Sequence, residues 1–152
     1  MTLCLIRRND ELLLGMKKRG FGTGRWNGYG GKVEAGETVP EAARREMKEE
    51  SGVELVDFEK VGVLDFEFVG KSEILEVNIF KSTKFIGEPT QTEEMNPQWF
   101  KIDDLPFSKM WPDDQHWMPL FLADKKFTGR FLFGEGDTNP IIEHELREVD
   151  TI

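Results

Sequence analysis

A glycine-rich segment over residues 20–36 runs directly into the most strongly marked helix of the chain, and this junction restricts the fold more than any other stretch. Thr38 is a favourable N-cap, and Glu41 three residues later completes a capping box. Gly52 is typical of the residue that ends a helix. The sequence therefore predicts an ordered loop followed by a helix over residues 39–51.

Three glutamates, Glu46, Glu49 and Glu50, stand at positions i, i+3 and i+4 of this helix and share one face. One interpretation of the cluster is an ordinary solvated acidic surface. The other is a magnesium site, because Mg²⁺ binds through a few carboxylates, waters and substrate phosphates. The glycine-rich, basic loop beside the cluster favours the metal site. A separate apolar stripe is predicted to pack on a sheet: Val39, Ala43 and Met47.

The charge distribution restricts the partners. A formal net charge of −9 makes the chain a poor ligand for duplex DNA or RNA. Residues 15–33 are the exception, with five basic side chains and no acidic one. This segment is either a solvated basic loop or a landing site for a small polyanion, and we expect the latter. Its basic residues are Lys17, Lys18, Arg19, Arg25 and Lys32.

The length of 152 residues suits a single domain, residues 1–152. No stretch approaches the roughly 18 apolar residues that a membrane helix requires, and the apolar run at the N-terminus is too short for a secretory signal. The lone Cys4 cannot form an internal disulfide, which fits a reducing compartment. We therefore expect a cytoplasmic monomer with no membrane or nucleic-acid partner.

Strand-like and helix-like hydrophobic patterns interleave along the rest of the chain. This arrangement predicts a layered α/β or α+β domain. An aromatic and proline-rich loop is expected over residues 107–117. Strands are predicted over residues 2–8, 11–18, 58–69, 73–85, 97–101, 127–134 and 142–149, and a second short helix over residues 117–125.

Residues 31–53 match, at every fixed position, the Nudix box G-x5-E-x7-R-E-U-x-E-E-x-G-U, in which U is aliphatic. The match is highly specific, so the chain resembles the Nudix hydrolase family. The resemblance implies a mixed β-sheet sandwiched between helices, and hydrolysis of a nucleoside diphosphate linked to another group. The fixed positions are Gly31, Glu37, Arg45, Glu46, Glu49, Glu50 and Gly52, with Met47 and Val53 in the apolar places.

The same resemblance implies roles for individual residues. Arg45 would hold Glu37 in place, and Mg²⁺, with Mn²⁺ as the alternative, would screen the phosphates and activate a water. Glu49 or Glu50 would also take the proton of that water. The expected metal ligands are Gly30 through its carbonyl, Glu46, Glu49, Glu50 and, from outside the box, Glu94; the catalytic set is these four glutamates with Arg45.

A purine substrate needs flat apolar walls and a few polar groups that bind its edge. Asn27, Asp113 and Asp114 are candidates for the polar groups, although the two aspartates could instead cap a helix. Their tryptophan neighbours favour a base pocket. Six aromatic residues are candidates for the walls, Phe21, Trp26, Phe66, Phe68, Trp111 and Trp117, of which we assign Trp26 and Phe68 to the core, together with Trp99.

Segments outside the box extend the resemblance over nearly the whole chain to one subgroup, the vertebrate-type MutT homologues that hydrolyse oxidised purine nucleoside triphosphates. The subgroup implies conversion of 8-oxo-dGTP and 2-hydroxy-dATP to monophosphate and pyrophosphate, in the cytoplasm and alternatively in the nucleus or mitochondrial matrix. The segments are residues 15–22, 24–33, 66–70, 110–114 and 147–151. The expected nucleotide contacts are Thr2, Lys17, Phe21, Asn27, Tyr29, Gly30, Gly31, Lys32, Phe66, Trp111, Pro112, Asp113, Asp114 and Trp117.

Two other functions stay open at this point. One is a Nudix hydrolase for a nucleotide sugar or dinucleoside polyphosphate, which the Asp113–Asp114 pair among aromatic residues disfavours. The other is a non-catalytic nucleotide-binding module, which the complete set of box glutamates disfavours. The chain departs from the subgroup where Thr2 stands almost at the N-terminus and where residues 138–142 lengthen a loop.

Overall fold

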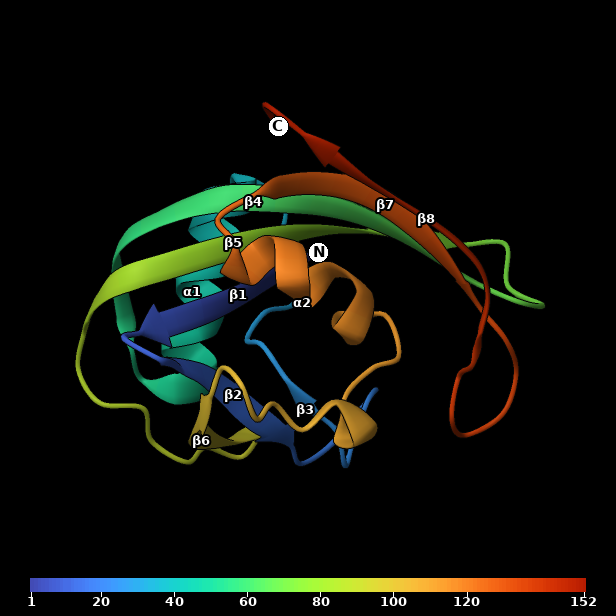
Figure 1. Ribbon diagram of the computed structural model, residues 1–152. Helices are drawn as coiled ribbons and strands as arrows, with labels where there is room; N and C mark the ends of the chain where they lie inside the picture. Colours follow the sequence, from blue (N-terminus) through green and yellow to red (C-terminus); the bar gives the residue numbers. More distant parts are fainter.

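The computed structural model describes residues 1–152 and contains one mixed sheet of eight strands and two α-helices (Figure 1). Strands and helices interleave along the chain, as the hydrophobic pattern predicts. In chain order the elements are β1 (Thr2–Arg8), β2 (Glu11–Lys17), β3 (Trp26–Asn27), α1 (Val39–Ser51), β4 (Glu54–Phe68), β5 (Ile74–Ile86), β6 (Met95–Lys101), the short 3₁₀ helix η1 (Phe107–Lys109), α2 (Asp114–Leu122), β7 (Lys126–Phe133) and β8 (Ile141–Val149).

Strands that are far apart in the sequence lie side by side in the sheet. The order is β3-β2-β1-β5-β4-β7-β8, and β6 pairs with β2. β1 is parallel to β5, with Thr2 opposite Asn78, and β4 is parallel to β7. The first strand of the chain therefore lies in the middle of the sheet.

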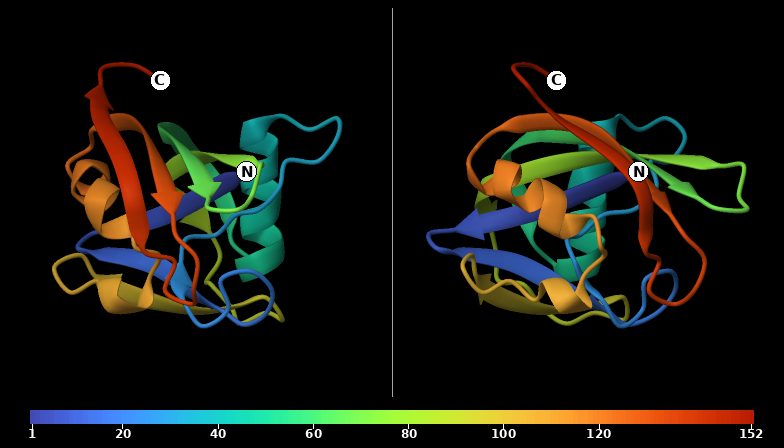
Figure 2. Two further views of the ribbon diagram at one scale, coloured as in Figure 1. Left: turned by 90° about the vertical axis from the view of Figure 1, so that its right-hand side faces the viewer. Right: turned by 45° about the vertical axis from the view of Figure 1, so that its right-hand side comes forward.

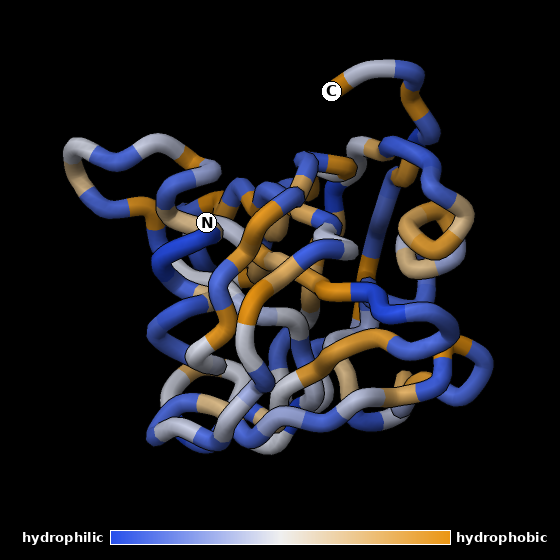
Figure 3. Tube along the Cα trace, turned by 90° about the vertical axis from the view of Figure 1, so that its left-hand side faces the viewer, coloured by the Kyte–Doolittle hydropathy of each residue, from blue (hydrophilic) through white to orange (hydrophobic).

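The two helices cover opposite faces of the sheet, as the left view of Figure 2 shows. Ala43 and Met47 of α1 belong to one buried cluster, and Trp117 and Phe121 of α2 belong to another. Hydrophobic stretches gather along the central strands, whereas the peripheral loops are largely hydrophilic (Figure 3). The predicted fold, a mixed sheet sandwiched between helices, is confirmed. Neither helix is long and apolar enough to cross a membrane.

Helix α1 has the predicted boundaries and the predicted cap. The Thr38 hydroxyl accepts from the Glu41 N–H, and the Glu41 carboxylate accepts from the Thr38 N–H, both at 3.2 Å. Gly52 ends the helix with φ 79°, a left-handed conformation that glycine adopts without steric cost. Ala43 and Met47 are fully buried. Their stripe fixes the rotation of the helix and turns the glutamate face toward the glycine-rich loop.

The largest differences from the predicted boundaries are in β4 and α2, and strand β3 was not predicted. Strand β4 begins at Glu54 rather than residue 58, because register shifts near Asp57 interrupt the alternation that marks a strand. Helix α2 begins at Asp114 rather than residue 117, although Pro119 lies inside it. The aromatic side chains of α2 pack on the sheet, and this packing stabilises the helix by more than the proline destabilises it. Strand β3 has only two residues, too few for a periodic pattern.

Candidate active site

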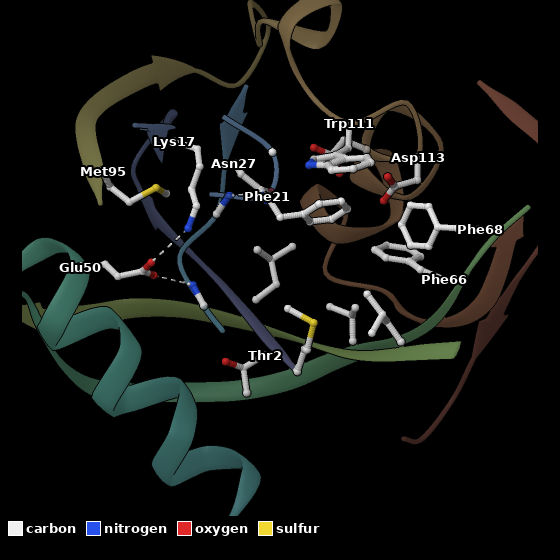
Figure 4. Close-up of a pocket in the computed structure, with 18 residues that line it drawn as sticks. Thr2, Lys17, Phe21, Asn27, Glu50, Phe66, Phe68, Met95, Trp111 and Asp113 are labelled. Carbon is white, nitrogen blue, oxygen red and sulfur yellow. Dashed lines mark hydrogen bonds and ion pairs between the residues drawn. The ribbon is translucent and has the colours of Figure 1, made fainter. Parts of the chain in front are cut away.

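A cavity opens between α1, the start of β1 and the loop before α2 (Figure 4). At one end Glu50 points toward Lys17, and at the other end lie Trp111 and Asp113. The cavity thus joins a predicted metal ligand to the predicted base-binding groups. The predicted residues that line it are Thr2, Lys17, Phe21, Asn27, Gly30, Glu50, Phe66, Trp111, Asp113 and Asp114.

Glu50 is the most enclosed of the predicted metal-ligating glutamates, with 5% of the residue exposed. Its carboxylate accepts a hydrogen bond from the Gly30 N–H at 3.0 Å, and Lys17 Nζ lies 4.0 Å away. Burial, reinforced by the negative charge of Glu46, raises the pKa of Glu50 to about 7, and Lys17 opposes the shift only in part. A carboxyl group in these surroundings is stabilised in its charged form by any further cation.

Arg45 ties the glycine-rich loop to α1. Its guanidinium donates to both carboxylate oxygens of Glu37, at 2.7 and 2.9 Å, which confirms the predicted pair. It also donates to Glu46 at 2.9 Å, to Glu49 at 3.3 Å and to the Lys32 carbonyl at 3.0 Å. The hydrogen bonds from Arg45 lower the pKa of Glu37 to about 2. The loop and the helix are therefore held as one unit.

Glu94 reaches the box from the residue before β6. Its carboxylate lies 2.6 Å from Arg19 Nη2 and 3.5 Å from Lys17 Nζ. The hydrogen bond from Arg19 lowers the pKa of Glu94 below its ordinary value. Lys17 contacts both Glu94 and Glu50, so the acid outside the box lies next to the buried glutamate of α1.

The donor set fits a hard divalent cation. The four predicted carboxylates offer only oxygen atoms, the ligands that Mg²⁺ and Mn²⁺ prefer. Arg45 pairs with Glu46 and Glu49, and Arg19 pairs with Glu94. No three acidic, histidine or cysteine side chains converge on one point. Burial is the larger cause of the raised pKa of Glu50, and the second cause is the negative charge of Glu46. A bound divalent cation would compensate it.

Asp113 and Asp114 lie at the opposite end of the cavity and are only 1% and 2% exposed. The Trp117 Nε1–H donates to Asp113 Oδ2 at 2.8 Å, whereas Asp113 Oδ1 has no partner. Burial raises the pKa of Asp113 to about 6. Burial, together with the charge of Asp113, raises the pKa of Asp114 well above its ordinary range. These surroundings favour one proton held between the two carboxyl groups.

The helix-cap alternative does not agree with this geometry, and Trp117 does not line the cavity. Asp113 occupies the N-cap position of α2, but its side chain makes no capping hydrogen bond. Trp117, predicted as a nucleotide contact, is 1% exposed and stacks on Phe127 with ring centroids 5.8 Å apart. It is a core residue whose indole N–H orients Asp113.

Tyr29 was also predicted to contact the nucleotide, but it is fully buried. Its neighbours Gly28 and Gly30 line the cavity. Tyr29 itself does not line the cavity. Its hydroxyl lies beside Gly15, as the end of the Met95 side chain does, and has no hydrogen-bond partner. Three further predicted contacts do not line the cavity: Gly31, Lys32 and Pro112.

Part of the apolar wall of the cavity was not predicted from the sequence. Phe68, assigned to the core, does stack on Phe133 with centroids 5.2 Å apart, but it also lines the cavity. Phe66 and Phe68 stand two residues apart on β4 and share one face, which is the signal that could have found Phe68. The other lining residues that were missed are Met1, Leu3, Gly22, Gly28, Leu75, Val77 and Met95.

The basic segment over residues 15–33 does not form one anion-binding surface. Of its five basic residues only Lys17 lines the cavity. Lys18 donates to the Thr92 carbonyl, and Arg19 pairs with Glu94. The predicted landing site for a polyanion is therefore reduced to Lys17.

Gly30 lies too close to β1 to accept a side chain, so Gly30→Ala is expected to lower the free energy of unfolding by about 3 kcal/mol. A Cβ at Gly30 would overlap the backbone carbonyl of Thr2. Gly31→Ala is the control, because its Cβ would meet only the carboxyl end of the flexible Glu46 side chain, at 2.7 Å. Urea unfolding measures both variants, and equal losses would show that the contact with Thr2 is not rigid.

Comparisons of this chain with known proteins by family model, by sequence and by structure agree with one another. The NUDIX domain model matches residues 1–121. The oxidized purine nucleoside triphosphate hydrolase of Mus musculus is 53% identical over 150 residues, which cover 99% of this chain and 95% of that protein. The Danio rerio protein of the same name is 51% identical over 152 residues, which cover 100% and 96%. A MutT protein from Bacillus halodurans has a TM-score of 0.84 at 29% identity, with 95% of each chain covered. The chain belongs to the Nudix family.

Proposed function

We propose that this chain hydrolyses oxidised purine nucleoside triphosphates, including 8-oxo-dGTP and 2-hydroxy-dATP, to nucleoside monophosphate and pyrophosphate. One observation carries the proposal: a single cavity joins a buried aspartate pair with aromatic walls to a glutamate of the Nudix box. The substrate class is supported by two relatives, 53% and 51% identical, that bear the name oxidized purine nucleoside triphosphate hydrolase. Residues 1–152 act as one catalytic domain.

The base binds at the aspartate end of the cavity. Trp111 and Phe66 supply flat apolar surfaces for the purine ring, and Asn27 supplies an amide that both donates and accepts. Asp113 and Asp114 bind the polar edge, one as acceptor and the protonated one as donor. Hydrolysis of oxidised nucleotides in this way removes them before a polymerase can use them.

The triphosphate extends toward α1. Nudix hydrolases generally need a divalent metal, and we propose Mg²⁺, with Mn²⁺ as the alternative, held by Glu46, Glu49, Glu50, Glu94 and the Gly30 carbonyl. When bound, the ion screens the phosphates and lowers the pKa of a water. Lys17 neutralises a phosphate oxygen, and Arg45 keeps the loop and the helix in register. Glu49 or Glu50 accepts the proton of the attacking water.

A panel of nucleotides with Mg²⁺, analysed by product chromatography, tests this function. We expect kcat/KM to be higher for 8-oxo-dGTP and 2-hydroxy-dATP than for dGTP and dATP. A preference for a nucleotide sugar or a dinucleoside polyphosphate would replace the substrate assignment and leave the Nudix chemistry in place. Absence of hydrolysis across the panel would indicate a binding module.

Hydrolysis in ¹⁸O-water is expected to label the pyrophosphate and not the monophosphate. Three of the four proposed carboxylates are anchored on α1, at the end of the cavity remote from the base, which favours attack of water on the β-phosphorus. Mass spectrometry of the two products locates the label. Label in the monophosphate would show attack at the α-phosphorus and would contradict the proposed position of the triphosphate.

The remaining expectations rest on the sequence. A net charge of −9 argues against a nucleic-acid partner, and a single cysteine fits a reducing compartment. We therefore propose a monomer that works without a nucleic-acid or membrane partner, in the cytoplasm and alternatively in the nucleus or mitochondrial matrix.

A further inference from the structure

Arg25 is a half-buried cation beside the base end of the cavity, and the proposed mechanism gives it no role. It is the residue before β3, and its backbone is fixed on both sides. The Lys17 N–H donates to the Arg25 carbonyl at 3.1 Å, and the Arg25 N–H donates to the Gly22 carbonyl at 3.2 Å. The side chain therefore starts from a defined position.

The Arg25 guanidinium holds two other parts of the molecule together. Its central carbon lies 4.1 Å from the ring centroid of Trp111, and its Nη2 donates to the Asp137 carbonyl at 3.1 Å. Asp137 belongs to the loop between β7 and β8, which lies beside the loop before β3 in both views of Figure 2. A guanidinium packed over an indole is attracted by the ring electrons, and the attraction grows as water is excluded.

Arg25 itself does not line the cavity, whereas Trp111 does. Trp111 also packs against Phe21 at 5.1 Å and Phe133 at 5.7 Å between ring centroids, but Phe21 is 67% exposed and gives weak support. The guanidinium is the one group that joins Trp111 to a second loop by a directed hydrogen bond. It therefore acts on a ligand through Trp111 and not by contact.

The charge of Arg25 also acts on the aspartate pair. Apart from each other and the Asp113 backbone, the groups that act on Asp113 and Asp114 are the Trp117 N–H from α2 and, with the smallest effect, Arg25 from the loop before β3. The positive charge of Arg25 lowers the pKa of both carboxyl groups and so opposes the effect of burial. It favours one proton on the pair over two.

We propose that Arg25 is a positioning residue for purine specificity, which fixes the Trp111 indole as a wall of the base pocket. The inference rests on the proposed function for the identity of the base. It adds a residue outside the cavity that determines how the base is held.

Arg25→Met tests the role, because it keeps an apolar stem of similar shape and removes the flat cation. The KM for 8-oxo-dGTP is expected to rise about tenfold, equivalent to about 1.4 kcal/mol, while kcat stays within about twofold. Inhibition by inorganic pyrophosphate, which occupies only the phosphate end, should not change. The pH profile of kcat/KM should move to higher pH, because loss of a neighbouring cation raises the pKa of the pair.

Arg25→Lys separates the two effects. Lysine restores the charge but not the flat stacking surface, so the pH profile should return toward that of the wild type while KM stays raised. Arg8→Met is the matched control, because Arg8 lies 3.9 Å from the ring centroid of Trp99 and neither residue lines the cavity. It removes an arginine–tryptophan pair of the same kind and should leave both KM and the pH profile unchanged.

The outcomes separate this inference from the proposed function. Equal KM values for Arg25→Met, Arg8→Met and the wild type would overturn the inference, as would an equal weakening of pyrophosphate inhibition in Arg25→Met. If the wild type hydrolysed no oxidised purine, the proposed function would fail. The affinity for 8-oxo-dGMP, measured by calorimetry, would then test the positioning role of Arg25. Weaker binding by Arg25→Met alone would support the inference, and equal binding or no binding by any variant would reject it.

Discussion

Glu50→Gln is expected to reduce kcat for 8-oxo-dGTP by about a thousandfold at saturating Mg²⁺. The substitution keeps the size of the side chain and its ability to accept the Gly30 N–H, which Glu50 accepts at 3.0 Å. It removes the charge that we propose for metal binding. Glu54→Gln is the matched control, since Glu54 is exposed at the start of β4 and loses the same charge. A rate for Glu50→Gln near that of the control would refute the metal-site assignment.

The same variant should fold at least as stably as the wild type in the presence of a chelator above pH 7. Burial raises the pKa of Glu50 from 4.5 to about 7, so the folded protein favours the neutral carboxyl group. The stability that this preference contributes is complete below pH 4.5 and is lost as the pH rises through about 7. Glutamine stays neutral at every pH and avoids that loss. Thermal unfolding at pH 5 and pH 8 measures the difference, and a large loss at both would indicate a misfolded variant.

Asp113→Asn and Asp114→Asn are each expected to change the ratio of activity on 8-oxo-dGTP to activity on 2-hydroxy-dATP by about tenfold or more. The two bases present different donors and acceptors, and a pair that shares one proton can match either by moving it. In an asparagine amide the oxygen only accepts hydrogen bonds and the nitrogen only donates them, so neither atom can change its role. A mismatch that leaves a buried polar group unpaired costs about 1–3 kcal/mol, which sets the size of the effect.

The pH dependence should follow the same pair. Because burial raises the pKa of Asp113 to about 6 and raises that of Asp114 well above its ordinary range, activity should depend on an ionisation above the usual aspartate range. Asp113→Asn removes the charge that helps to raise the pKa of Asp114, so the profile should move to lower pH. Values of kcat/KM across pH for both substrates give the result. Variants that scale both activities equally and keep the wild-type profile would exclude the pair from base recognition.

The helix of the box was predictable because its signals are local. Thr38, Glu41 and Gly52 act within a few residues of one another, and the capping box and the left-handed stop are formed as predicted. The Arg45–Glu37 pair was accessible only through the family resemblance, since loop geometry decides which acid reaches the guanidinium. The shared face of Glu46, Glu49 and Glu50 follows from helix spacing, but the burial of Glu50 alone depends on the strands around it.

The orientation of the aromatic residues was not predictable in the same way. Trp111 and Trp117 both flank the aspartates in sequence, yet one lines the cavity and the other is enclosed in the core. The difference arises from the packing of α2 on β7, where Trp117 stacks on Phe127, a contact between separate elements. For Phe68, the alternation of side chains along β4 predicts which face of the sheet it lies on. It does not predict that part of this face lines a cavity.

The central place of β1 has a consequence for how the protein is made. Its hydrogen-bonded partner, residues 78–82 of β5, leaves the ribosome long after residues 2–6. Contacts between segments so far apart form slowly. Until they form, a nascent chain exposes the apolar strand that begins Thr2-Leu-Cys-Leu-Ile, and such a segment can aggregate or bind a chaperone. Thr2 also bonds the glycine-rich loop at Gly31 and lines the cavity, so this part of the pocket can form only after β5 has left the ribosome.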